Sequence, residues 1–199
     1  SAGRAPLALS VDLATASTDA VVSKGDAALA MHRSAATPDL TRIDLTRVPL
    51  AWSQALLSQA WPAANLKAGR MTGGLDIDTA AARPLRVSGR LAVSGLGLDT
   101  QDGSIAAEGL GADLDIDYRS SSTVSLVTVD GQLRGGEMLA GSAYIALPST
   151  PVNISLAARQ AGQGGWEIPQ LSWDDGDAMR VQGALGFNTN LDLQDADIR

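Results

Sequence analysis

The chain has 199 residues and a formal net charge of −7, with 45% hydrophobic but only 4% aromatic residues. Its 15 Lys and Arg residues are scattered, which disfavours nucleic-acid binding because that function needs a clustered basic surface. No cysteine is present, so thiolate zinc sites, thiol catalysis and disulfides are excluded. The apolar residues are rich in alanine and poor in aromatics, which predicts a thin core and therefore one curved sheet.

A first run of strands is predicted over residues 7–48. Apolar residues alternate with small and polar ones across 7–13, the period-two pattern of a half-buried strand. Turn signals separate the further strands of this run, which we place at 20–22, 27–31 and 40–48. The chain begins just before these strands, and we expect it to be a fragment of a longer protein.

The stretch 50–61 is the one segment whose apolar residues follow a helical period of about 3.6 residues. Pro49 precedes it and Pro62 follows it. Proline is tolerated at the start of a helix, and the residue before a proline is pushed out of the helical region. The sequence therefore predicts one short helix over 50–61, dividing the chain into strand runs 7–48 and 69–193.

This predicted helix lies in an uncharged stretch between Arg47 and Lys67. It is too short to span a bilayer, which needs about 20 apolar residues. The simpler interpretation is a helix packed on the end or face of a sheet. The alternatives are a lipid-facing lid, in which Trp52 and Leu56 would contact the ligand, or an amphipathic foot on a membrane.

The second run is more regular. A connector is predicted at 65–69, and the next strands carry apolar residues on one side and Arg, Ser or Asp on the other. The parity of the pattern switches at Gly95, which predicts a β-bulge there. The apolar side of these strands consists of Leu75, Ile77, Leu85, Val87, Leu91, Val93, Leu114 and Ile116.

The remaining strands follow turn signals spaced roughly 8 to 14 residues apart, the spacing of an antiparallel meander. A second bulge is predicted near Leu126 and Val127, and a tight reversal at Arg134–Glu137. The last strands are placed at 144–147, 152–156, 166–173, 179–187 and 191–193. The predicted fold is thus mainly β, a curved antiparallel meander forming a β-groove or open barrel-like sheet with one short helix, in a single elongated domain over 1–199.

No catalytic motif stands out. His32 is the only histidine, and the chain contains no G-x-S-x-G elbow and no phosphate-binding loop, so we expect no enzymatic activity and no cofactor. The acidic residues Asp113, Asp115 and Asp117 would project from one strand face about 7 Å apart, too far for one ion, and the spacing does not match an EF-hand. The cluster Asp174–Asp177 is better explained as a solvated turn, so no metal is expected.

The chain resembles part of the bacterial cell-envelope proteins of the AsmA-like group, which includes the TamB-like and YdbH-like proteins. The resemblance covers about residues 40–160 and is carried by Ala60-Trp61-Pro62, Gly69–Ile77, Pro84–Leu91 and Gly131–Glu137. It implies a repeating β-groove in the periplasm that carries phospholipid between the inner and outer membranes. The parent protein would be anchored in the inner membrane, and its neighbouring β-segments would continue the groove. The group has no catalytic residues to transfer, and the resemblance leaves open whether this chain is a groove segment or a plugged end module.

Three functions therefore remain from the sequence. An open apolar face would bind phospholipid acyl chains, with the eight apolar residues of the second run as the lining. A face closed by other parts of the fold would make a purely structural β-module. A carbohydrate-binding domain would instead use Trp166 and Trp173 for stacking on sugar rings.

Overall fold

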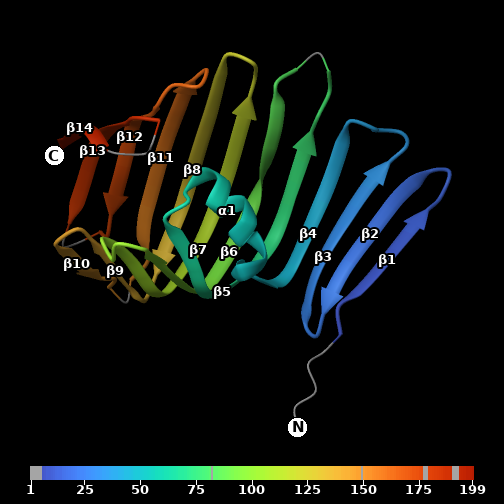
Figure 1. Ribbon diagram of the computed structural model, residues 1–199, viewed down its shortest axis with the longest axis horizontal. Helices are drawn as coiled ribbons and strands as arrows, with labels where there is room; N and C mark the ends of the chain where they lie inside the picture. The colour runs from blue at the N-terminus through green and yellow to red at the C-terminus, as the bar shows by residue number, and fades with distance from the viewer. Residues whose placement is uncertain (1–5, 82, 149, 177–178, 190–192) are drawn as a thin grey trace, which may run out of the picture.

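The computed structural model describes residues 6–81, 83–148, 150–176, 179–189 and 193–199. Within them a single 14-stranded sheet is formed, accompanied by a short helical segment (Figure 1). The strands are β1 (Ala8–Leu13), β2 (Ser17–Lys24), β3 (Ala27–Ser34), β4 (Leu40–Pro49), β5 (Ala64–Asp78), β6 (Leu85–Thr100), β7 (Ile105–Ser120), β8 (Val124–Arg134), β9 (Glu137–Ala140), β10 (Ala143–Ala146), β11 (Val152–Ala161), β12 (Trp166–Asp174), β13 (Arg180–Phe187) and β14 (Leu193–Ile198).

The sheet is an antiparallel meander. Strands β1 to β8 and then β11 to β14 lie side by side in chain order, while β9 pairs with β7 and β10 pairs with β9. In the described part of the chain β1 and β14 each pair with a single neighbour, and they lie at opposite ends of the long axis in Figure 1. The predicted fold class, a mainly β, open and curved meander with one short helix, is confirmed.

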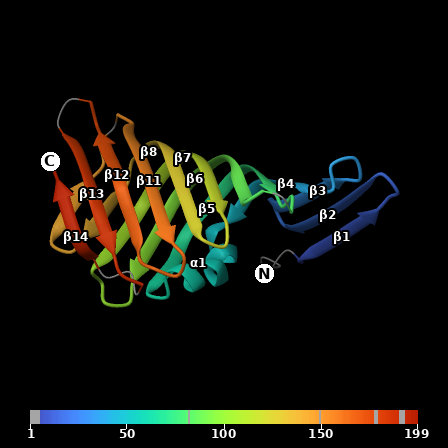
Figure 2. The same cartoon turned by 90° about the horizontal axis from the view of Figure 1, so that it is seen from above.

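The predicted helix is present with almost the predicted bounds. It consists of a 3₁₀ turn, η1 (Leu50–Ser53), and an α-helix, α1 (Gln54–Ala60). Pro49 caps the first turn, and Trp61 leaves the helical region with φ of −143° just before Pro62. Both helical pieces contact β5, and Figure 2 shows α1 on one side of the sheet.

A row of glycines crosses the neighbouring strands β5, β6 and β7 and the bend between β8 and β9. Gly69, Gly95, Gly109, Gly135 and Gly136 have φ between 57° and 117°, a region that other residues rarely adopt. They adjoin one another across the strands, since a Cβ on Gly69 would lie 3.2 Å from the Gly95 carbonyl oxygen and one on Gly136 would lie 2.6 Å from the carbonyl carbon of Gly109. We call this row the glycine crease. The bulge predicted at Gly95 is confirmed, because the β6–β7 register shifts between Val93 and Leu96.

The tight reversal predicted at Arg134–Glu137 is wrong. Arg134 is opposite Gly111 and Glu137 is opposite Glu108, so β8 and β9 run in the same direction along β7 and only a bend separates them. The bend is possible because Gly135 and Gly136 both have positive φ. A double glycine signals a hairpin in most sequences, but here it belongs to the glycine crease.

The bulge predicted near Leu126 is also wrong. Leu126 and Val127 pair without interruption with Arg119 and Tyr118 of β7. Leu126 therefore lies on the polar side of the sheet, where its side chain is 42% exposed. This exposed leucine interrupts the alternation of apolar and polar residues in the sequence, although the backbone of β8 is regular at this point.

Residues 65–69, predicted as a connector, belong to β5. Strand β1 was expected to be half-buried, yet all its residues are exposed, because it is an edge strand paired only with β2. For the last predicted strand, residues 191 and 192 lie outside the described residues, and β14 begins at Leu193.

The buried core is small and is spread over several strands and the start of the helical segment. Among the described residues the buried hydrophobic side chains are Ala27, Leu45, Val48, Leu50, Ala64, Leu110 and Val152. The accessible surface is 12240 Å², whereas a compact monomer of 20.4 kDa exposes about 8,800 Å². The chain therefore exposes more surface than a compact domain of its mass.

Candidate ligand groove

The pairing registers place all eight predicted lining residues on one face of the sheet. Leu75 is opposite Gly89, and Gly89 is opposite Ile116; Leu91 is opposite Leu114. Residues directly opposite each other point to the same side. This side, called the inner face, carries Leu75, Ile77, Val87, Leu91, Val93, Leu114 and Ile116 as half-buried side chains and Leu85 as an exposed one.

The inner face continues beyond the predicted lining. Ile116 is opposite Val129, Val129 is opposite Leu156, and Leu156 is opposite Leu171, so the apolar row runs on through β8, β11 and β12. Sequence reasoning did not include these residues in the lining. The signal was their period-two alternation, which the wrongly placed bulge near Leu126 concealed.

A hollow of 340 Å³ opens on the inner face where the lower margin of the sheet bends inward. Ile145 of β10 lies on one side of it, and Val129, Ile154 and Trp173 lie on the other. We call it the corner hollow. No charged side chain is among the described residues that line it.

The two tryptophans proposed for sugar binding share the inner face. Trp166 and Trp173 are an odd number of positions apart, which in a regular strand would place them on opposite faces. The pairing of β11 with β12 contains a register shift between Ala157 and Arg159, and this shift puts both tryptophans on the same face. They are seven positions apart, about 23 Å along an extended strand, so they do not form one stacking platform. The indole N–H of Trp173 is buried and has no partner among the described residues, so it is not available to a sugar hydroxyl.

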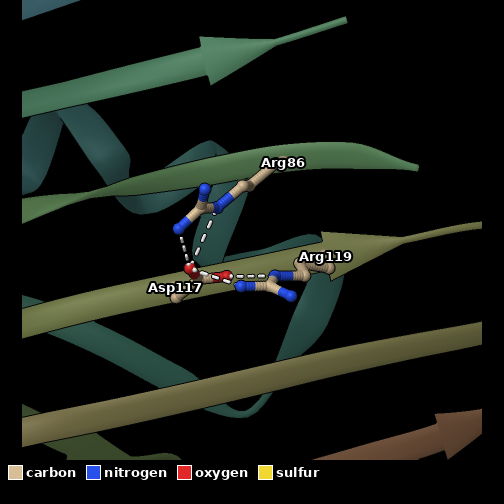
Figure 3. A network of polar contacts seen from close by, with 3 residues as sticks. All are labelled: Arg86, Asp117 and Arg119. Carbon is tan, nitrogen blue, oxygen red and sulfur yellow. Dashed lines mark hydrogen bonds and ion pairs between the residues drawn. The ribbon is translucent and has the colours of Figure 1, made fainter. Parts of the chain in front are cut away.

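The opposite face of the sheet, called the outer face, carries many ion pairs. Figure 3 shows Asp117 between two arginines, accepting hydrogen bonds from Nε of Arg119 and Nε of Arg86, each at 2.9 Å. The Arg119 guanidinium, followed by that of Arg86, holds the pKa of the Asp117 carboxyl below its ordinary value. Pairs of this kind contribute little stability when exposed, but they keep this face polar.

The other acidic residues considered for calcium are paired in the same way. Oδ1 of Asp115 lies 2.8 Å from Nε of Arg90, and Oδ2 of Asp113 lies 2.9 Å from Nη2 of Arg134. Asp174 lies 2.7 Å from Arg180, and Asp177 lies outside the described residues. Within the described part of the chain, no cluster of His, Asp or Glu could hold a metal ion.

The two proposed lid residues are both open to solvent. Trp52 is 36% exposed and Leu56 is 70% exposed, while the polar Gln54 and Ser58 are half-buried. The side chain of Gln54 donates hydrogen bonds to Ser58 Oγ and the Ala64 carbonyl, and it accepts one from the Leu66 N–H. The helix thus attaches to β5 through a polar side chain and leaves part of its apolar surface free.

None of the helices in the described residues has the length and apolar character needed to cross a membrane. Comparison of the chain with protein-family models, with curated proteins and with solved structures finds no match.

Proposed function

We propose that this chain binds the acyl chains of phospholipid on its inner face, as a segment of a bacterial cell-envelope protein that moves lipid between the inner and outer membranes. The envelope setting, the periplasmic location and the continuation of the groove by neighbouring β-segments follow from the resemblance to the AsmA-like group. The acyl-chain binding is supported independently by the geometry of the sheet.

The observation that carries the proposal is a long apolar face with nothing over most of it. None of the lining residues from Leu75 to Leu171 is fully buried, and the whole chain exposes roughly 3,400 Å² more surface than a compact domain of its mass. Apolar patches of more than a few hundred Å² mark binding surfaces in soluble proteins. Each methylene group buried there would contribute about 0.8 kcal/mol.

The two alternatives have less support. A purely structural module should seal its apolar face, and here few apolar side chains of the described residues are buried. A sugar-binding site would need several polar groups next to the tryptophans, whereas the described residues around Trp173 are mainly apolar, with Ser155 and Ser172 as the polar ones.

The test places one charge on each face of the sheet. Leu91→Asp puts a carboxylate on the inner face, where its desolvation against an acyl chain costs several kcal/mol. Leu126→Asp is the matched control, because it makes the same change on the outer face between its register partners Arg119 and Arg159. Native mass spectrometry of the purified chains measures the phospholipid that co-purifies with each.

We expect the unsubstituted chain and Leu126→Asp to carry phospholipid and Leu91→Asp to have lost it, with all three folded by far-UV circular dichroism. Equal lipid in both variants would place the lipid elsewhere. An unfolded Leu91→Asp beside a folded control would mean that the inner face is a closed core, and the proposal would then be wrong.

A further inference from the structure

The corner hollow differs from the rest of the inner face because it has walls on two sides. Ile145 comes from β10, below the glycine crease, and Ile154 and Trp173 come from β11 and β12, above it. Elsewhere the inner face is an open surface, and an acyl chain bound there would be contacted from one side only. Here the bent sheet forms a recess of 340 Å³, within the range of about 300–1,000 Å³ that is usual for small-ligand sites.

The lining of the recess selects the chemistry of its occupant. The inner-face rows Ile154–Trp173–Val181 and Val129–Leu156–Leu171 supply aliphatic groups and one indole ring. A phosphate, carboxylate or ammonium group would lose its hydration there and, among the described lining residues, would meet no charged side chain to compensate for the loss. A hydrocarbon segment meets no such penalty.

We propose that the corner hollow receives the methyl-terminal part of a single long acyl chain, with the methyl end innermost and the polar end of the lipid outside the hollow. This inference rests on the proposed function and makes it more specific. The volume of the hollow sets the chain length that the site prefers. Methylene groups that do not fit into the hollow are contacted by the protein from one side only.

The experiment measures binding of saturated fatty acids from C10 to C18 to the purified chain by isothermal titration calorimetry. Each methylene group that enters the hollow should tighten binding by up to about fourfold, and the increase per methylene should become clearly smaller when the hollow is full, because further groups are contacted from one side only. Ile145→Trp fills the recess from the β10 side, so its series should level off at a shorter chain. Tyr144→Trp is the matched control, because Tyr144 is the neighbouring residue on the same strand, does not line the hollow, and is exposed.

A second measurement avoids any bulky substitution. Stearic acid brominated near the methyl end should quench tryptophan fluorescence more strongly than stearic acid brominated near the carboxyl group, because only the distal segment reaches Trp173. Trp173→Phe should abolish this difference.

The outcomes separate this inference from the proposed function. If the unsubstituted chain binds no fatty acid and carries no phospholipid, the proposed function fails. If it binds, but Ile145→Trp and Tyr144→Trp give the same chain-length series, or the two brominated acids quench equally, the lipid lies elsewhere on the inner face and the corner hollow is not the chain-end site.

Discussion

At the scale of single residues, the inner face owes its curvature to glycines that allow neighbouring backbones to approach closely. Gly89 has φ of 158°, and a Cβ at this position would lie 2.0 Å from the Gly74 carbonyl oxygen. Any side chain there would force β5 and β6 apart. Gly186 provides a comparison, because a Cβ on it would meet nothing closer than 3.6 Å.

Gly89→Ala should therefore lower the free energy of unfolding by about 1–3 kcal/mol, the cost of one strained backbone position. Gly186→Ala should change it by less than about 0.5 kcal/mol. Urea titrations followed by circular dichroism give both values. Equal effects of the two substitutions would show that the close approach at Gly89 is not needed for the curved sheet.

Most of the lining could be predicted from the sequence because a strand repeats every two residues. Alternation of Leu91 and Val93 with Arg90 and Ala92 fixes their faces as soon as the strand is recognised. The predictions failed where the alternation of apolar and polar residues in the sequence does not match the alternation of side chains between the two faces of the strand. Leu126 looked like a bulge and is only an exposed leucine, while the actual bulge in β12 put Trp173 on the same face as Trp166.

At the scale of elements, the helix was predictable in its bounds but not in its orientation. The flanking prolines determine where it begins and ends. Its attachment depends on hydrogen bonds from Gln54 to the backbone of Ala64 and Leu66, at 2.9 and 2.7 Å, which no sequence pattern indicates. A polar residue in the middle of a short neutral helix would normally be assigned to the solvent side.

Gln54→Ala should loosen this attachment. It leaves the Leu66 N–H and the Ala64 carbonyl without their side-chain partner, and an unsatisfied half-buried group costs about 1–3 kcal/mol. Gln59→Ala removes an exposed glutamine from the same helix and should change stability by less than about 0.5 kcal/mol. Thermal unfolding of both variants measures the difference, and a Gln54→Ala melt no lower than that of Gln59→Ala would contradict the proposed attachment.

At the scale of the whole molecule, stability should vary along the sheet. The middle strands β5, β6 and β7 are the longest and have the helix and the crease beside them, whereas β1 is exposed along its whole length. Elements that contact only their neighbours open from the ends, as in repeat proteins.

Hydrogen exchange followed by mass spectrometry should therefore show the slowest amides in β5 to β7, faster exchange in β11 to β13, and the fastest in β1, β2 and β14. A chain in which all strands exchange at one common rate would instead unfold as a single unit, and the dependence on neighbours would be wrong.

The meander, in which nearly every strand pairs with the strands before and after it in the chain, also has a consequence for how such a protein could evolve. In a closed sheet the strand number, tilt and stagger are fixed together, so a strand cannot be added without rebuilding the rest. Here duplication or loss of the hairpin β1–β2 would alter only one pairing and leave the corner hollow untouched. The length of such a molecule, and with it the distance it spans, could change by gene duplication in steps of two strands while its ligand chemistry stayed the same.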